Sequence, residues 1–256
     1  MGTAVVSGSA SGIGAAVRRR LERDGDRVVG VDLHDAEVEA DLSTPAGRAA
    51  AIAGVKAACP DGIDRLVLCA GLGAHVDDVP KIASVNYFGA VELLDAFREA
   101  MAGRPDAAAV VVCSNSAQLG PFEEHPFVLA LLDHDETRAH ALLEGDAGGG
   151  YIAYGGSKHA LSRAVRRRAA EWGKAGVRLN GIAPGPTDTP LMEGAVAHPI
   201  WGKGVEALEI PLGRWAAPDE MAGIIAFLLG PDAGYVHGSI WFADGGNDAA
   251  IRPDRF

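Results

Sequence analysis

The sequence predicts an α/β fold built on a doubly wound, parallel β-sheet. Short apolar runs alternate with helix-like segments along the whole chain. The runs are nearly continuous in Val, Leu, Ile and Ala, which is typical of strands that helices cover on both faces. No internal repeat or long linker divides the 256 residues. We therefore expect a single domain over residues 1–256.

The elements can be placed in order along the chain. Seven apolar runs predict strands at residues 3–8, 27–32, 38–43, 64–71, 108–114, 177–185 and 239–246. Segments with helical periodicity predict helices at residues 13–25, 44–58, 84–102, 151–172 and 219–230. Gly25 can end the first helix, and Thr44 followed by Pro45 is a typical helix start. This alternation predicts a Rossmann-type sheet of about seven strands.

Composition excludes several classes of function. The formal net charge of −11 argues against nucleic acid or an acidic membrane surface as the main partner. No uninterrupted apolar stretch approaches the roughly 18 residues of a membrane span. The three cysteines are odd in number, widely separated and lack metal-binding spacing, so we interpret them as reduced thiols. We expect a cytoplasmic protein without a metal site.

A glycine-rich turn follows the first predicted strand. The segment "SGSASGIG" places Gly8, Gly12 and Gly14 between a strand and a helix. Such a turn lets the backbone approach a pyrophosphate at the helix N-terminus. Asp32 ends the second strand, where a carboxylate can accept hydrogen bonds from the adenosine ribose and repel a 2′-phosphate. The turn therefore predicts NAD(H) as the cofactor, in preference to NADP(H).

Further motifs resemble those of the short-chain dehydrogenase/reductase family over essentially the whole chain. The glycine spacing is GxxxGxG, and Tyr154 and Lys158 form the family's YxxxK motif. Other matching segments are Asp41–Leu42, "CAG" at 69–71, "VNYFG" with Asn86, Ser114, "NGIAPGPTDTP" and "DGG" at 244–246. Leu68–Cys69 depart from the family pattern, in which an asparagine pair is usual. Segments such as "ASVNYFGA", "GVRLN" and "YVHG" are most similar to steroid-oxidising bacterial members of the family.

The resemblance implies four catalytic residues. The i, i+4 spacing places Tyr154 and Lys158 on one helix face, where an ammonium group could lower the tyrosine pKa and make it an acid/base. Ser114 would hydrogen-bond the substrate oxygen. By resemblance, Lys158 also holds the nicotinamide ribose and Asn86 organises a water-mediated proton path. The implied cofactor contacts are Gly8, Ser11, Gly12, Ile13, Gly14, Asp32, Asp41, Leu42, Ala70, Gly71, Tyr154, Lys158, Pro184, Gly185, Thr187 and Thr189.

A substrate pocket is expected beside these residues. The segment after Thr189 resembles the family's mobile substrate loop, and its apolar side chains could contact a hydrophobic substrate or pack on the protein body. Tyr151 lies one turn before Tyr154 and is expected to wall the cleft or to pack. The expected pocket residues are Ser116, Tyr151, Leu191, Met192 and Trp201, with Ile200 as a further apolar candidate.

A long segment separates Ser114 from Tyr154. We expect a helical insertion after the fifth strand, at about residues 119–149, with a helix that Gly145 can end. It could wall the substrate pocket or shape subunit contacts, and we favour an oligomer-shaping role with a contribution to the pocket edge. Its polar residues fit no common metal pattern and predict a solvated face. They are His125, Asp133, His134, Asp135, Glu136 and His140.

Together these features predict an NAD(H)-dependent oxidoreductase that interconverts a secondary alcohol and a ketone on a small hydrophobic substrate. A 3α-hydroxysteroid and its 3-oxo form are the most specific expectation. An aromatic or allylic alcohol of the coniferyl type is the alternative substrate. A cofactor-binding regulatory protein without catalysis is the alternative from another class, which the intact Asn86, Ser114, Tyr154 and Lys158 disfavour. A homo-oligomer, dimer or tetramer, is expected by resemblance.

Overall fold

The computed structural model describes residues 2–144 and 149–255. All seven strands pair in parallel, in the order β3-β2-β1-β4-β5-β6-β7. Their bounds are β1 (Thr3–Ser7), β2 (Arg27–Asp32), β3 (Val38–Glu39), β4 (Arg65–Leu68), β5 (Ala108–Val112), β6 (Arg178–Pro184) and β7 (Ile240–Ala243). The predicted α/β, single-domain, doubly wound fold is confirmed. The strand order reverses between β1 and β4, which is where such sheets bind ligands.

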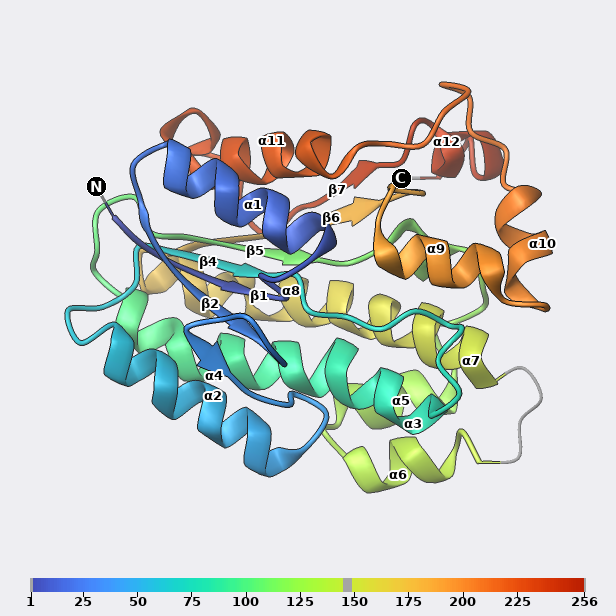
Figure 1. Ribbon diagram of the computed structural model, residues 1–256, viewed down its shortest axis with the longest axis horizontal. Helices are drawn as coiled ribbons and strands as arrows, with labels where there is room; N and C mark the ends of the chain where they lie inside the picture. The colour runs from blue at the N-terminus through green and yellow to red at the C-terminus, as the bar shows by residue number, and fades with distance from the viewer. Residues whose placement is uncertain (1, 145–148, 256) are drawn as a thin grey trace.

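Helices cover both faces of this sheet (Figure 1). Helices α1 and α11 pack together on one face, while α2, α4 and α8 lie on the other. The long helices are α1 (Gly12–Arg23), α2 (Pro45–Ala58), α4 (Ala90–Met101), α8 (Ser157–Lys174) and α11 (Pro218–Leu229). The shorter ones are α3 (Val79–Ala83), α5 (Pro126–Leu132), α6 (Glu136–Ala141), α7 (Gly149–Tyr151), α9 (Pro190–Ala197), α10 (Trp201–Glu206) and α12 (Asn247–Ile251). The described residues also contain the 3₁₀ turns η2 (Asn115–Gln118) and η4 (Pro231–Ala233).

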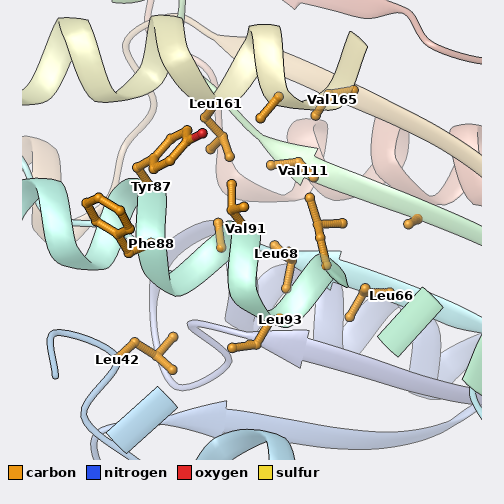
Figure 2. Packing of buried hydrophobic residues seen from close by; sticks show 14 of the residues in the cluster. Leu42, Leu66, Leu68, Tyr87, Phe88, Val91, Leu93, Val111, Leu161 and Val165 are labelled. Carbon is orange, nitrogen blue, oxygen red and sulfur yellow. The ribbon is translucent and has the colours of Figure 1, made fainter. Parts of the chain in front are cut away.

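The larger apolar core lies between the sheet and the α2, α4 and α8 layer (Figure 2). Leu66, Leu68 and Val111 project from the strands toward Val91 and Leu161 on the helices, and all five are buried. Burying apolar surface contributes about 25 cal/mol per Å², so this layer is a rigid support for groups mounted on α4 and α8. A second cluster fills the space under α1 and α11.

Two helices contain π-helical turns that the periodicity does not predict. The helix expected at 84–102 begins five residues earlier with α3, passes through the π-helical turn η1 (Ser84–Gly89) and continues as α4. The helix expected from Tyr151 starts with α7, passes through the π-helical turn η3 (Ile152–Gly156) and continues as α8. Each turn inserts one residue into the helical repeat, which rotates the side chains around it.

The insertion after β5 forms two short helices instead of the single predicted helix. They are α5 and α6, separated by a turn in which His134 adopts φ 60°. Asp135 accepts a hydrogen bond from the Arg138 backbone N–H, at 2.9 Å, and thereby caps α6. Helix α5 packs on α8, and α6 packs on α3. Gly145, the predicted end of the helix, lies outside the described residues.

Candidate active site

The glycine-rich turn joins β1 to α1 at the carboxyl edge of the sheet. Gly8 has φ +70°, and a Cβ there would lie 2.7 Å from the Ala70 backbone nitrogen. A Cβ on Gly14 would overlap the carbonyl oxygen of Gly8. Both positions therefore require glycine, because the turn after β1, the loop after β4 and the start of α1 are in direct contact. The turn leaves the first backbone N–H groups of α1 open to an anion.

Asp32 lies beside this turn at the end of β2. Its Oδ2 accepts from the Ala10 backbone N–H at 2.9 Å, and its Oδ1 accepts from the Leu33 N–H at 2.7 Å. Both oxygens are thus fixed and each keeps a lone pair for a further donor. The open N–H groups and the fixed carboxylate fit the pyrophosphate and ribose of NAD.

Ser114 and Tyr154 meet at the neighbouring strand end. Ser114 follows β5, and Tyr154 lies in η3, from which its hydroxyl donates to Ser114 Oγ at 3.4 Å. The Ser116 hydroxyl also donates to Ser114 Oγ, at 2.9 Å. Because Ser114 Oγ accepts in both contacts, its own hydrogen is available to donate to a substrate oxygen.

Lys158 and Asn86 lie behind this pair. Lys158 is buried, and its Nζ donates to the Val112 carbonyl at 2.8 Å. Asn86 is fully buried, and its amide accepts from the Leu72 N–H at 2.7 Å and donates to the Leu72 carbonyl at 3.0 Å. A Cβ on Gly71 would lie 3.2 Å from Asn86 Oδ1 and 3.4 Å from Lys158 Nζ. The two polar groups therefore face one small space that glycine keeps open.

The pKa of Tyr154 differs in direction from the sequence expectation. Burial raises the pKa of Tyr154 above 10.0, although hydrogen bonds with Ser114 and Ser116 oppose the shift. Burial likewise lowers the pKa of Lys158, against opposing contributions from Cys113 and Cys69. Burial therefore opposes the acidification of the phenol that the ammonium is expected to produce. Desolvation of both groups disfavours their charged forms.

A single cavity of about 610 Å³ brings nearly all of the predicted site residues together. Its lining includes Ser114, Tyr154 and Lys158, all sixteen predicted cofactor residues, and the five predicted substrate residues Ser116, Tyr151, Leu191, Met192 and Trp201. Asn86 does not line it, because Asn86 is buried behind Gly71 and Leu72. The glycine turn, the Ser–Tyr pair and the apolar wall thus share one space.

The apolar wall of the cavity comes from α9, α10 and the start of the insertion. Tyr151 donates its hydroxyl to the Leu119 carbonyl at 2.7 Å and stacks on Trp201 at 6.5 Å between ring centroids. It is therefore a wall residue of the cavity. Ile200 is 68% exposed and does not line the cavity, so the structure does not bring it together with the other candidates.

Sequence reasoning missed several residues of this wall. Leu119, Val205 and Leu208 also line the cavity. Val205 follows Trp201 by four positions on α10, so helical spacing could have identified it, whereas Leu208 lies beyond the end of that helix. Of the insertion, Leu119 lines the cavity and Phe122 packs on Tyr151 with ring centroids 5.7 Å apart. This is the expected contribution to the pocket edge.

Within residues 2–144 and 149–255, no three His, Cys, Asp or Glu side chains are grouped so that they could hold a metal ion. In the same part of the chain, no helix has the length and apolar character needed to cross a bilayer.

Comparison with known proteins agrees with this geometry. Two family models match, "short chain dehydrogenase" over residues 2–127 and "Enoyl-(Acyl carrier protein) reductase" over residues 141–248. The chain is 51% identical to the 3-alpha-hydroxysteroid dehydrogenase/carbonyl reductase of Comamonas testosteroni, over the full length of both. It is 33% identical to the coniferyl-alcohol dehydrogenase of a Pseudomonas strain, over 94% of each chain.

A solved structure is similar over the whole fold. The 3-alpha-hydroxysteroid dehydrogenase of Pseudomonas sp. B-0831, crystallised with NADH, superposes with a TM-score of 0.96. It is 44% identical, and the match covers 99% of this chain and all of that one. By its glycine turn, its Ser–Tyr–Lys arrangement and these matches, the chain belongs to the short-chain dehydrogenase/reductase family.

Proposed function

We propose that this protein is an NAD(H)-dependent oxidoreductase that interconverts a 3α-hydroxysteroid, or a related hydrophobic secondary alcohol, with its ketone. The observation that carries the proposal is the shared cavity, in which Ser114 and Tyr154 lie between the glycine turn and an apolar wall. The identity to the Comamonas enzyme over full length supports the substrate class.

The cofactor contacts favour NAD(H). The fixed carboxylate of Asp32 can accept from ribose hydroxyl groups, and it would repel a 2′-phosphate. Arg18, the first arginine of α1, forms ion pairs with Glu22 and Glu37, with the shortest contact at 2.6 Å. When bound, NAD supplies the hydride acceptor for alcohol oxidation and, as NADH, the hydride donor for ketone reduction.

The protein supplies position and the proton. In ketone reduction Tyr154 gives its phenolic proton to the substrate oxygen, while Ser114 donates a hydrogen bond to the same oxygen and stabilises its developing charge. In alcohol oxidation the phenolate takes the proton back. The Lys158 ammonium stabilises that phenolate, and Asn86 and Lys158 hold the small space behind Gly71 through which the proton can be replaced. These roles rest on the geometry and on the family resemblance.

The apolar wall suits a rigid hydrophobic substrate. Tyr151 and Trp201 present stacked aromatic rings, and Leu119, Val205 and Leu208 add aliphatic surface. Burying such surface contributes about 25 cal/mol per Å², which favours a large apolar skeleton over a small polar alcohol. The relative that acts on coniferyl alcohol supports an aryl-allylic alcohol as the second candidate.

A substrate panel tests the proposal. NADH formation is followed by its absorbance with a 3α-hydroxysteroid, its 3β epimer, coniferyl alcohol and a small aliphatic secondary alcohol. We expect the highest kcat/KM for the 3α-hydroxysteroid, with little turnover of the 3β epimer. A higher kcat/KM for coniferyl alcohol would replace the steroid with the second candidate, and no oxidation of either would contradict the proposal.

We also propose that the protein is a cytoplasmic homo-oligomer. Strand β7 is one edge of the sheet, and Trp241, Phe242 and the neighbouring Phe227 are each more than a third exposed. Apolar side chains beside an unpaired strand favour contact with a second copy. The insertion covers part of α8, so we expect the contact at this aromatic face. Sedimentation of Trp241→Glu tests it: wild type should be a dimer or larger, and the variant should dissociate.

A further inference from the structure

A buried arginine connects the insertion to the rest of the α/β core. Arg48 on α2 is 2% exposed, and two of its guanidinium nitrogens donate hydrogen bonds to the Glu136 carboxylate of α6, at 2.6 and 3.2 Å. Its Nε lies 2.9 Å from Glu92 Oε1 on α4, and its Nη1 donates to the Leu42 carbonyl at 3.4 Å. The guanidinium also lies over the Phe88 ring, 5.8 Å from the centroid. The face that the sequence predicts to be solvated is therefore partly a buried ionic contact.

Glu136 also contacts the π-helical turn η1. The hydroxyl of Ser84, the first residue of η1, donates to Glu136 Oε1 at 2.7 Å. His140 Nε2 lies 2.9 Å from the same hydroxyl oxygen, which suits a hydrogen bond donated by that nitrogen. Burial alone would raise the pKa of Glu136, but hydrogen bonds from Arg48 and Ser84 hold the pKa below its ordinary 4.5. One carboxylate thus ties α6 to both α2 and η1.

The same π-helical turn carries Asn86, two residues after Ser84. The Asn86 amide holds Leu72, and its Nδ2 also lies 3.4 Å from Ser157 Oγ. Ser157 Oγ in turn donates to the carbonyl of Tyr154, at 2.9 Å, in the other π-helical turn η3. π-Helical turns are rare because their backbone geometry is less favourable than that of an α-helix. Such a turn keeps its shape only where surrounding contacts hold it.

We propose that Glu136 and Ser84 are positioning residues for Asn86, and that the insertion braces the proton-transfer machinery through α6. The brace acts from the side of η1 that faces away from the cavity, and no residue of α5 or α6 lines that cavity. This role rests on the proposed function, because it gives Asn86 a part in proton transfer. The insertion would therefore support catalysis within one subunit, independently of any contact between subunits.

Ser84→Ala is the most selective test, since it removes one hydroxyl and leaves the Arg48–Glu136 ion pair in place. We expect kcat for the 3α-hydroxysteroid to fall about 10- to 100-fold, the range expected when a catalytic group is displaced by up to about 1 Å. The Kd of NADH should change less than about twofold, because Ser84 does not line the cavity. Glu171→Gln is the matched control, as it breaks the exposed Arg98–Glu171 pair between α4 and α8 and should leave kcat unchanged.

A double-mutant cycle separates positioning from a general structural effect. In an Asn86→Ala background, Ser84→Ala should cause no further loss of kcat, because its route of action is gone. The single variants Ser84→Ala and Asn86→Ala should each shift the acidic limb of the kcat–pH profile for alcohol oxidation, in the same direction and by a similar amount. Glu136→Ala should lower kcat about as much as Ser84→Ala does. The double variant Ser84→Ala/Glu136→Ala should have a kcat little below that of either single variant.

Several outcomes would overturn the brace. They are an unchanged kcat in Ser84→Ala, equal losses from Ser84→Ala in both backgrounds, or fully additive losses from Ser84→Ala and Glu136→Ala. An Asn86→Ala variant with normal kcat would do so as well, since Ser84 would then have no catalytic group to position. Tyr154→Phe distinguishes failure of the brace from failure of the proposed function. If Tyr154→Phe abolishes turnover while the brace tests fail, the oxidoreductase function is retained and only the role of Glu136 and Ser84 is rejected.

Discussion

Replacement of Asp32 by alanine tests the predicted choice of cofactor. Two backbone N–H groups hold the carboxylate at the end of β2, with donor–acceptor distances of 2.9 and 2.7 Å, so its position does not depend on the ligand. Removing it deletes acceptors for the ribose hydroxyl groups of NADH. It also deletes a negative charge that would face the 2′-phosphate of NADPH.

The magnitude follows from two contributions. A hydrogen bond to a charged group contributes about 1.5–3 kcal/mol, so the Kd of NADH should rise roughly 10- to 150-fold. Two unit charges about 4 Å apart repel by about 4 kcal/mol near a protein surface, and solvent screening at a partly exposed carboxylate reduces this to about 2 kcal/mol. Together these contributions shift the NADH/NADPH preference by roughly three orders of magnitude.

Titration of cofactor fluorescence with wild type and Asp32→Ala measures both Kd values. Asp61→Ala is the control, because Asp61 is an exposed carboxylate near the opposite end of the sheet, before β4. A preference ratio that stays within about threefold of wild type, well below the three orders expected from the charge and hydrogen-bond terms, would refute the role of Asp32.

Three further predictions concern the site and its support. Burial raises the pKa of Tyr154, so without cofactor this tyrosine should ionise above pH 10. The measurement is the difference in tyrosinate absorbance between wild type and Tyr154→Phe as the pH rises. A midpoint below pH 10 would contradict the expectation. Arg48→Met leaves two partly buried carboxylates unpaired and should lower the free energy of unfolding in urea by about 3 kcal/mol; a change under about 1 kcal/mol would show that the pairs are not stabilising. Gly71→Ala puts a methyl group between Asn86 and Lys158 and should reduce kcat on the order of tenfold, which a normal kcat would exclude.

The sequence predicts the sheet well because its strands are buried on both faces. Their apolar runs, the glycine turn and Asp32 are local patterns with a direct structural meaning. The YxxxK spacing likewise identifies Tyr154 and Lys158, although η3 lies where a regular α-helix is expected. A π-helical turn changes backbone hydrogen bonds without changing the apolar pattern, so periodicity does not reveal it.

The contacts of the insertion were beyond sequence reasoning for a different reason. Arg48 and Glu136 are 88 positions apart, and each alone has the appearance of an ordinary surface charge. Their pairing depends on how α6 packs on α3, which is a tertiary property. The direction of the Tyr154 pKa was also missed, because the desolvation of a buried phenol depends on atoms from several distant segments.

The most direct test of the account is the turnover of Tyr154→Phe with the 3α-hydroxysteroid and NAD. The change removes only the phenolic oxygen, so the ring still packs, and the loss of one cofactor hydrogen bond of about 1 kcal/mol should raise the Kd of NADH by no more than about tenfold. Loss of the general acid/base should lower kcat by about 10²–10⁴-fold. A variant that binds NADH and turns over at the wild-type rate would contradict the assignment of Tyr154 as the proton donor and acceptor.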